Sequence, residues 1–401
     1  MRGLCFIAGE EPAMSASAVT GYDQCHSPLT ADPIYQEEKP ESQNRDDTDS
    51  PAHRSHDPGA NLKRTDPFRF GSRFLEADDN VFEFNAWDHV TPDESYFAYA
   101  EAQFANQRAS PVSDFNRKRF NTEPAKWWNK FYSNNTSNFF KDRKWLQQEF
   151  PILSKLMAKD SAPATILEVG AGAGNTAFPI LKANENEWLM IHACDYSSKA
   201  VDLIQNNESF DPQHIRASVW DISEPKLPEG IAEGSIDVVL LIFIFSALHP
   251  DQWSCAVQNV FRALKPGGEI CFRDYGHGDL TQVRFKKERL LSENFYIRGD
   301  GTRVYFFSEE ELRQIWGGIA KNVAGGPVLE NETSLNENDA HHRRSDDGRP
   351  TAPRQPGCFD RSMKPAFHII SLGVDRRMLV NRKKELKMYR CWMQGRFQKP
   401  L

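Results

Sequence analysis

Four apolar runs follow one another through the middle of the chain, and each ends at or near a polar residue. They cover residues 165–169, 189–195, 217–221 and 236–245. Apolar runs of this length, separated by segments of helical pattern, predict parallel strands that alternate with helices. The last run is almost unbroken, which is typical of a central strand covered on both faces. The pattern predicts an α/β fold with a doubly wound, mostly parallel sheet whose ligand lies at the carboxyl ends of the strands.

Two further strand-like segments lie near the end of the chain, at 367–374 and 388–397. In the second, apolar and polar residues alternate, as in a strand with one buried face. We expect these segments to close the sheet as an antiparallel terminal strand pair. Residues 320–365 before them are rich in Asn, Asp, Glu, Arg, Pro and Gly, which predicts a disordered surface insertion. His341 and His342 within it have no Cys or third His at ligand spacing, so we expect no metal site.

Three glycines at alternate positions, Gly170, Gly172 and Gly174, follow the first apolar run, and Glu168 stands just before them. Glycine lets backbone N–H groups come close to a ligand. A dinucleotide-binding turn needs Gly-x-Gly-x-x-Gly, so that pyrophosphate meets a helix N-terminus. In this chain the third glycine comes one residue early, Asn175 occupies its expected position, and an acidic residue is poorly placed for phosphate. The turn suits a ligand with an ammonium group, such as the methionine part of S-adenosylmethionine (SAM); a glycine-rich turn of another α/β protein is the alternative.

Two acids follow the next apolar runs. Asp195 ends the second run, 21 residues after Gly174. A carboxylate at this position of a nucleotide-binding fold binds the hydroxyls of an adenosine ribose. Asp221 ends the third run, where it can accept a hydrogen bond from the adenine amino group. The acids therefore favour an adenosine-containing ligand.

The net charge of −7 belongs to the first 60 residues, which hold four Lys/Arg and eleven Asp/Glu. This stretch is rich in Ser, Asp, Glu and Pro and has no hydrophobic period, which predicts a disordered acidic tail over 1–66, with Met14 as a second candidate start. No run approaches the ~20 apolar residues of a membrane helix, so we expect no membrane partner. The seven cysteines form no Cys-x-x-Cys pair, which argues against a disulfide framework and favours a reducing compartment. Cys194 and Cys271 lie in apolar runs and are expected in the core.

Positive charge and aromatic side chains occur together in three segments, at 108–120, 126–144 and 375–400. The last segment holds nine Lys/Arg against two acids, and the middle one holds five against one. Basic residues bind phosphates while aromatic faces stack on unpaired bases, so the combination predicts an RNA-binding surface. The alternative is a solvated basic face above aromatic core residues.

Several longer motifs are far more specific than a glycine loop. They are Phe-Gly-Ser-Arg at 70–73, Asn-Ala-Trp-Asp at 85–88, Trp-Asn-Lys-Phe-Tyr at 128–132, Asn-Phe-Phe-Lys-Asp-Arg at 138–143, Phe-Arg-Asp-Tyr-Gly at 272–276, the whole segment 294–307 and Val-Asp-Arg-Arg at 374–377. Through them the chain resembles the METL family of SAM-dependent tRNA 3-methylcytidine methyltransferases, especially its fungal branch, from about residue 69 to residue 400. The insertion before residue 367 is longer than in most relatives, and the first 60 residues match nothing in the family.

The resemblance implies a class I, Rossmann-like methyltransferase domain over 151–400 with SAM as its cofactor. A mainly helical region over 67–150 would precede it, bind tRNA and close a lid over the cofactor, because Trp128 and Tyr132 lie at i and i+4 on one helix face. The cofactor-binding residues implied by the pattern and the resemblance together are Trp128, Tyr132, Glu168, Gly170, Gly172, Asp195, Asp221, Ile222 and Ile242.

The resemblance also implies the substrate, cytidine 32 in the anticodon loop of tRNA(Thr), with tRNA(Ser) as a further candidate. Cytosine N3 has a free lone pair at neutral pH, so methyl transfer needs no obligatory general base, and alignment can supply ~7 to 11 kcal/mol. The methylated base is cationic, so a nearby carboxylate would stabilise the developing charge. We expect Asp274 in this catalytic role, with Arg273 and Tyr275 positioning the base; a helix cap or an internal ion pair is the alternative. His249, at a strand end, is a further pocket candidate.

The expected macromolecular partner is tRNA, bound through its anticodon stem-loop in the cytoplasm. The residues expected to contact RNA are Lys141, Arg143, Arg298, Arg303, Arg376, Arg377 and Arg390. Some relatives act with an accessory protein such as seryl-tRNA synthetase. Two other classes remain open: a SAM-dependent small-molecule methyltransferase, which has no use for basic aromatic segments, and a non-catalytic RNA-binding protein with a relic SAM pocket.

Overall fold

The computed structural model describes residues 73–137, 139–317 and 365–401. The predicted acidic tail at 1–66, the pair His341 and His342, and nearly all of the predicted insertion at 320–365 lie outside the described residues. Within the described ranges, every helix is too short or too polar to cross a membrane.

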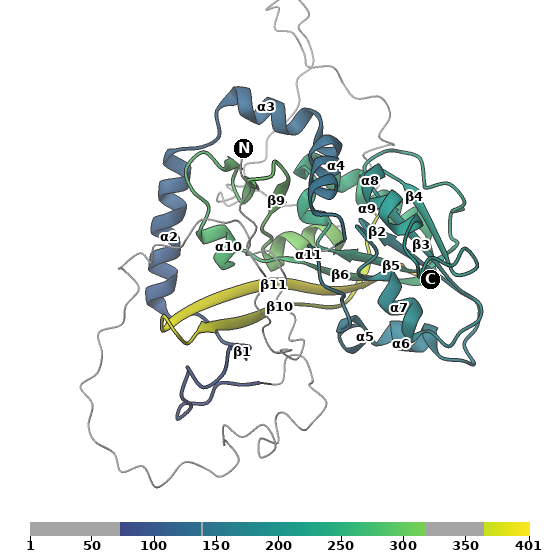
Figure 1. Ribbon diagram of the computed structural model, residues 1–401, viewed down its shortest axis with the longest axis horizontal. Helices are drawn as coiled ribbons and strands as arrows, with labels where there is room; N and C mark the ends of the chain where they lie inside the picture. Colours follow the sequence, from purple (N-terminus) through teal and green to yellow (C-terminus); the bar gives the residue numbers. More distant parts are fainter. Residues whose placement is uncertain (1–72, 138, 318–364) are drawn as a thin grey trace, which may run out of the picture.

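An eight-stranded sheet forms the centre of the described chain, in the order β1-β10-β11-β6-β5-β2-β3-β4 (Figure 1). Its parallel strands are β2 (Ala164–Val169), β3 (Leu189–Asp195), β4 (Ile215–Val219), β5 (Ile236–Ile242) and β6 (Leu264–Tyr275). The four predicted parallel strands are confirmed, although β4 begins and ends two residues earlier than expected and β5 ends three residues earlier, at Ile242. The parallel part of the sheet starts at β2, continues to β3 and β4 on one side, and then crosses to β5 and β6 on the other. This reversal is the topology of a doubly wound sheet.

Alternate residues of β5 enter two different hydrophobic cores, as the two-residue period of a strand requires. Val239 and Leu241 pack on one face of the sheet, and Val238 and Leu240 pack on the other. The first face is covered by α9 (Trp253–Ala263) and α11 (Glu309–Gly317), and the second by α6 (Pro151–Met157), α7 (Ala177–Ala183) and α8 (Ser198–Gln205). Because helices cover both faces, every position of β5 can be apolar, which explains the unbroken run in the sequence.

The strands β10 (His368–Asn381) and β11 (Leu386–Gln398) form a long antiparallel hairpin beyond β6. The predicted terminal pair is therefore confirmed, but both strands are longer than expected. The sequence underestimates β10 because Arg376 and Arg377 interrupt its apolar pattern. In the structure Arg377 is 4% exposed and pairs with Asp88, so the strand continues through the charged residues.

The N-terminal region is mainly helical, as expected, but it also contributes a strand to the sheet. The short strand β1 (Ala86–Asp88) pairs antiparallel with β10. The helices that follow are α2 (Glu94–Ala109), α3 (Asp114–Thr122), α4 (Pro124–Asn135) and α5 (Leu146–Glu149). Asp93 caps α2 by accepting a hydrogen bond from the N–H of Tyr96. In Figure 1, α2 stands beside the far end of the hairpin, and α3 and α4 lead from it to the parallel strands.

A second sheet, which the sequence did not predict, consists of β7 (Leu290–Ser292), β8 (Phe295–Ile297) and β9 (Arg303–Tyr305). Each strand has only three residues, and the turn signals Asn294 and Gly301 lie between them. Strand β9 contacts the short helix η3 (Phe245–Ala247), which follows β5. The small sheet therefore covers the loop at the carboxyl end of β5.

Candidate active site

A cavity lies between the carboxyl ends of the parallel strands and helix α4. Eight of the nine residues predicted to bind the cofactor line it; only Glu168 does not. The doubly wound topology places these strand ends together, although they are distant in sequence. The structure thus collects the predicted cofactor residues at one site.

The glycine loop after β2 leaves its backbone open to this cavity. Gly170, Gly172 and Gly174 have φ values of +67°, +59° and +85°, in the left-handed region that favours glycine. A Cβ on Gly170 would lie 1.8 Å from Cδ1 of Ile244, and one on Gly172 would lie 2.7 Å from the hydroxyl oxygen of Tyr132. Neither position can hold a side chain without a shift of its neighbour, so the ligand meets backbone atoms here.

Asp195 lies beside this loop at the end of β3 and is 6% exposed. Its Oδ2 accepts from the N–H of Gly172 at 2.8 Å, and its Oδ1 accepts from the N–H of Ser197 at 2.8 Å. Burial raises its pKa to about 6, although the backbone N–H groups act in the opposite direction. The backbone of Tyr196 also bonds to this carboxylate, and the two oxygens together still keep acceptor capacity for ligand hydroxyls.

Asp221 follows β4 at the same edge of the sheet. Its Oδ1 accepts from the backbone N–H and the hydroxyl of Ser223, at 2.8 and 2.6 Å. Neither bond uses Oδ2, so the side chain is held in place while one oxygen keeps its acceptor capacity. Asp195 and Asp221 together supply hydrogen-bond acceptors at neighbouring strand ends.

Helix α4 covers the cavity. Trp128 and Tyr132 both line it, and their rings stack with centroids 6.2 Å apart. Between them, Asn129 accepts a hydrogen bond from the hydroxyl of Ser197 at 2.7 Å, which ties α4 to the start of α8. On the neighbouring face, Trp127 packs so tightly on Gly301 that a Cβ there would lie 2.2 Å from the indole ring. The predicted lid helix is thus in position over the site; its closure remains a prediction.

Glu168 and Arg143 lie at the other end of the glycine loop. Glu168 is 1% exposed, and its carboxylate lies 3.9 Å from the guanidinium of Arg143. Burial raises the pKa of Glu168 to about 7, and the charge of Arg143 opposes this increase. Arg143, which was expected to contact RNA, lines the cavity and donates to the hydroxyl of Thr176 at 2.7 Å.

These groups fit SAM. The carboxylates can accept from ribose and adenine and can balance an ammonium group, and Arg143 can pair with a carboxylate. The side-chain-free loop admits the ligand to the backbone.

The three residues predicted to be catalytic lie at the end of β6 and do not line the cavity. Asp274 is fully buried, and its carboxylate accepts from the N–H groups of Ser246 and Tyr275, both at 2.9 Å. Burial raises the pKa of Asp274 to about 6. Tyr275 is 1% exposed, and its ring lies 5.0 Å from that of Phe243. Their direct catalytic role remains a prediction, while their contacts support the loop after β5.

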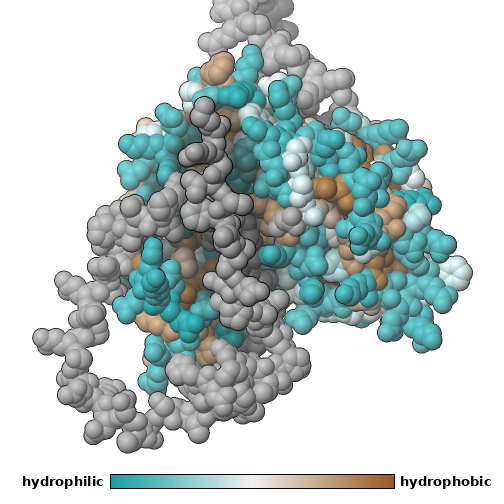
Figure 2. Space-filling view, viewed as in Figure 1, coloured by the Kyte–Doolittle hydropathy of each residue, from teal (hydrophilic) through white to brown (hydrophobic). Residues whose placement is uncertain are grey.

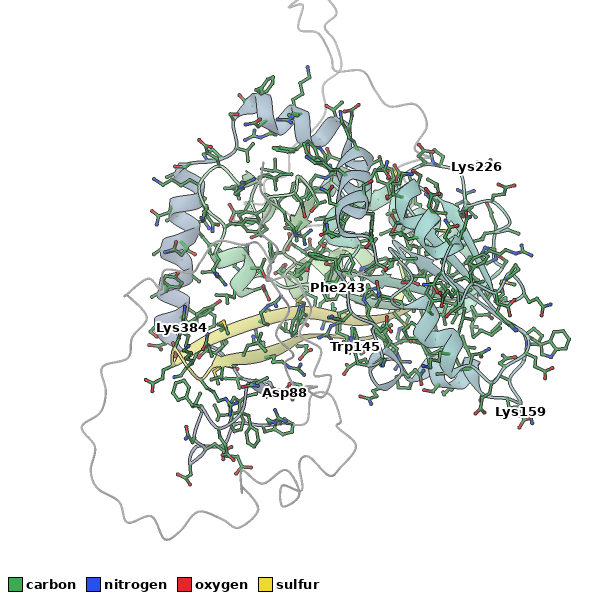
Figure 3. The ribbon with its side chains drawn as sticks, viewed as in Figure 1. Asp88, Trp145, Lys159, Lys226, Phe243 and Lys384 are labelled. Carbon is green, nitrogen blue, oxygen red and sulfur yellow. The ribbon has the colours of Figure 1, made fainter. Side chains whose placement is uncertain are left out.

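Arg273 is 2% exposed and forms the internal ion pair that was the alternative reading. It bonds to Asp375 and Gln394 of the hairpin. Its guanidinium carbon lies 5.0 and 5.1 Å from the rings of Trp145 and Trp392; Trp145 is labelled in Figure 3. The residue therefore joins β6 to the hairpin rather than facing the cavity.

The residues expected to contact RNA separate into several groups. Arg377 and Arg390 are each 4% exposed and pair with Asp88 at 2.6 Å and Asp279 at 2.9 Å (Asp88 is labelled in Figure 3). Both lie in the interior, where RNA has no access in this conformation. Lys141 is exposed and Arg376 is half-buried on the hairpin.

Arg298 and Arg303 belong to the segment of β8 and β9. Arg298 is half-buried, donates to the carbonyl of Arg303 at 3.2 Å and lies over the ring of Tyr275, so it braces the turn. Arg303 is 5% exposed, lines the cavity and bonds to Asn121 at 3.3 Å and Gln252 at 3.5 Å. Burial lowers the pKa of Arg303 to about 10.

The exposed basic residues of the described chain include a group on α3 and α4. Helix α3 has no buried residue, and its Phe115 is 78% exposed. Lys118, Arg119, Lys126 and Lys130 are exposed nearby. Hydrophilic residues predominate in Figure 2 where Figure 1 places these two helices. This arrangement keeps the basic and aromatic combination on the surface beside the lid.

The remaining candidates have structural roles. His249 accepts from the N–H of Asp251 at 3.3 Å and caps η4 (Pro250–Gln252), and burial lowers its pKa. Cys194 and Cys271 are buried in the core, as expected. In the part of the chain that the structure describes, no group of three or more His, Cys, Asp or Glu residues could hold a metal.

The sequence did not indicate several residues that line the cavity. Phe140, Phe243 and Tyr196 belong to it, as do Arg143 and Arg303 in a different role from the one expected. Phe243 lies inside an apolar run that reads as a buried strand, so no pattern marks it. Its φ of +61° distinguishes it only in the structure.

The glycine loop, the acids at neighbouring strand ends and the doubly wound sheet with its antiparallel hairpin define a class I methyltransferase with SAM as its cofactor. Residues 167–270 match a methyltransferase domain family.

Two fungal relatives identify the branch. The chain is 47% identical over 344 residues to the tRNA(Thr) (cytosine(32)-N(3))-methyltransferase of Saccharomyces cerevisiae. The aligned region covers 85% of this chain and 48% of that protein. The chain is also 45% identical over 330 residues to a tRNA N(3)-methylcytidine methyltransferase of Schizosaccharomyces pombe, covering 82% of this chain and 92% of that protein. The chain belongs to the tRNA N(3)-methylcytidine methyltransferases. Among solved structures, a SAM-dependent methyltransferase from Methanosarcina mazei matches with a TM-score of 0.38 and 16% identity, over 63% of this chain and 98% of that one.

Proposed function

We propose that this protein transfers a methyl group to N3 of cytidine 32 in the anticodon loop of tRNA(Thr). The 47% identity to a Saccharomyces enzyme named for that position and that tRNA carries the proposal. The chain spans about half the length of that enzyme, but it spans 92% of the Schizosaccharomyces relative, which is named for the same modification. The matched region therefore accounts for nearly all of the smaller relative.

The residues of the cavity have separate tasks in this reaction. SAM supplies the methyl group. Asp195 and Asp221 bind and orient the adenosine part, and Arg143 pairs with the methionine carboxylate. Trp128 and Tyr132 cover the site and exclude water. Their combined effect is alignment, which converts an encounter of two reactants into a reaction within one complex.

The composition of the cavity lining supports this mechanism. Among the described residues, the lining contains no His, Lys or Cys that would act as a general base. Cytosine N3 uses its own lone pair, so the chemistry does not need such a base. The target base must be unpaired, because its Watson–Crick edge has to enter the cavity.

We further propose that the tRNA lies on the exposed basic surface of α3 and α4. A tRNA bound to this surface would lie beside the lid helix and the entrance of the cavity. The proposal also includes tRNA(Ser) as a second substrate. It further includes an accessory protein, such as seryl-tRNA synthetase, and a cytoplasmic location. Methylation of tRNA(Ser) with and without the synthetase tests the first two, and cell fractionation tests the third.

Purified protein, SAM and a tRNA(Thr) transcript test the main proposal. Because a methyl group on N3 blocks base pairing, reverse transcriptase is expected to stop at position 32. A transcript with uridine at position 32 is the matched substrate control, and Asp195→Ala is the matched protein control; neither is expected to give the stop. SAM turnover that is independent of RNA would favour a small-molecule methyltransferase, and tRNA binding without any product would favour a non-catalytic RNA-binding protein.

A further inference from the structure

Phe243 has a backbone conformation that a bulky residue rarely adopts. It follows β5 directly, with a φ of +61°. A left-handed conformation is unfavourable for an L-residue with a side chain, and such residues cluster at functional sites. Glycine would avoid this strain, so the presence of an aromatic ring here needs a reason.

The surrounding structure holds this conformation in place. The N–H of Phe243 donates to the carbonyl of Arg273 at 2.7 Å. Three residues further on, the buried carboxylate of Asp274 accepts from the N–H of Ser246 at 2.9 Å. Between these two bonds, the side chain of Ile244 fills the space that Gly170 leaves open. The loop is therefore fixed at both ends, and the ring of Phe243 is presented to the cavity.

The sheet topology places Phe243 on the side of the cavity opposite the two acids that suit adenosine, which leaves this side for the methyl acceptor. The acids that suit adenosine lie at the ends of β3 and after β4, on one side of the glycine loop of β2. Phe243 follows β5, which pairs with β2 on the other side. Figure 3 shows Phe243 near the centre of the molecule, well away from Lys384 at the tip of the hairpin.

No carboxylate among the described residues lines the β5 side of the cavity, where the positive charge would develop. During transfer, a bond forms between N3 and the methyl carbon while the bond from carbon to sulfur breaks. The lone pair of N3 supplies the electrons, the sulfonium becomes a neutral thioether, and the positive charge moves to the cytosine ring. Among the described residues, the only acids that line the cavity are Asp195 and Asp221, on the adenosine side. Asp274 is sealed behind the loop.

Aromatic rings are the groups that remain to stabilise this charge. Phe243 lines the cavity on the β5 side, and its ring lies 5.0 Å from that of Tyr275. The nearby guanidinium of Arg143 lies 6.0 Å from the Phe243 ring, but it is directed to the glycine loop by its bond to Thr176 and its proximity to Glu168. An aromatic face attracts a cation through its quadrupole, more strongly where water is excluded.

Resting on the function proposed above, we propose that Phe243 is a catalytic residue: the target cytosine lies against its ring, and the ring stabilises the positive charge that the base acquires. Asp274 and Ile244 act as positioning residues that hold the loop. The carboxylate that was expected to face the base is thereby replaced by an aromatic face.

A series of fluorinated phenylalanines at position 243 tests this proposal in the full-length protein. Fluorine changes the ring size little but progressively weakens its attraction for cations. We expect kcat to decrease stepwise with each added fluorine, by about 3- to 30-fold over the series. The affinity for S-adenosylhomocysteine and the KM for tRNA are expected to stay constant. The same series at Phe210, a partly buried residue next to β4, is the matched control and is expected to leave kcat unchanged.

Simple substitutions separate loss of the ring from loss of the fold. Phe243→Tyr keeps an aromatic face and is expected to lower kcat less than Phe243→Leu, which is expected to lower kcat by a factor similar to that of the fluorinated series. Both variants are expected to keep their affinity for S-adenosylhomocysteine, which reports that the site is folded. If wild-type protein produces the stop at position 32 but kcat is equal across the fluorinated series, the inference is overturned and the proposed function stays intact. Absence of the stop with wild-type protein would refute the proposed function itself.

Discussion

The carboxylate of Asp195 offers the sharpest test of the cofactor site. In Asp195→Ala, the N–H groups of Gly172 and Ser197 lose their acceptor, at a cost of about 1 to 3 kcal/mol each in a buried site. The cofactor also loses a charged acceptor for two ribose hydroxyls, worth about 1.5 to 3 kcal/mol each. Two such bonds correspond to a loss of affinity of at least about 100-fold, since ~1.4 kcal/mol is a factor of ten.

Titration calorimetry with S-adenosylhomocysteine measures this loss directly. Asp202→Ala is the matched control, because Asp202 lies on α8 with a 53% exposed side chain and pairs only with Lys199 among the described ion pairs. We expect the control to bind like wild type, and both variants to keep their affinity for tRNA, because neither acid lies on α3 or α4. An affinity of Asp195→Ala within about fivefold of wild type would refute the assignment of this residue to the ribose.

Three further predictions concern the loop, the buried acid and the charged residues. Gly170→Ala is expected to lower affinity for S-adenosylhomocysteine at least about tenfold, since its Cβ meets a neighbour at 1.8 Å; Gly278→Ala, with φ +83° and nothing within 4 Å, carries the strain alone and should bind normally. The pKa of Glu168 rises from 4.5 to about 7 on folding, so the unfolded chain releases this proton first and wild-type stability decreases as pH rises between these values. The difference in the free energy of unfolding between Glu168→Gln and wild type should therefore increase by about 3 kcal/mol in favour of Glu168→Gln as the pH rises from 4.5 to 7, measured by thermal melts without ligand. A difference that does not change with pH would contradict this reasoning. Arg377→Met leaves the buried carboxylate of Asp88 without its ion-pair partner and should lower the free energy of unfolding by about 3 to 5 kcal/mol. Lys118→Ala should keep the melting temperature and should reduce the slope of log affinity for tRNA against log salt concentration by about 1. The reverse pattern would show that RNA contacts the hairpin interior instead.

The fold could be predicted because its signals are local. Four of the five parallel strands coincide with the four apolar runs, whereas β6 begins in a stretch that contains Lys, Pro, Gly and Glu. The glycine loop follows the first run, and Asp195 ends the second. The position of Trp128 and Tyr132 on one helix follows from their spacing of four. These features depend on neighbouring residues, so a single sequence contains them.

The other parts of the site depend on contacts between distant segments. Arg377 and Arg390 look like RNA ligands in the sequence, yet both pair with aspartates more than 100 residues away. The charge pattern of a strand cannot show that its arginines have internal partners. Phe243 is similar, because its left-handed backbone results from bonds to β6 and not from its own neighbours in the run.

The strand β1 has a consequence for how the protein can be divided. It pairs with β10, and its Asp88 neutralises Arg377 in the interior. A fragment that begins at residue 151 would keep every residue of the glycine loop but would lose this neutralising charge and the aromatic cluster of Phe84, Trp87, Tyr96 and Phe104 that packs on the hairpin. We therefore expect that the catalytic half does not fold on its own, because the segment that precedes it in the chain completes its sheet.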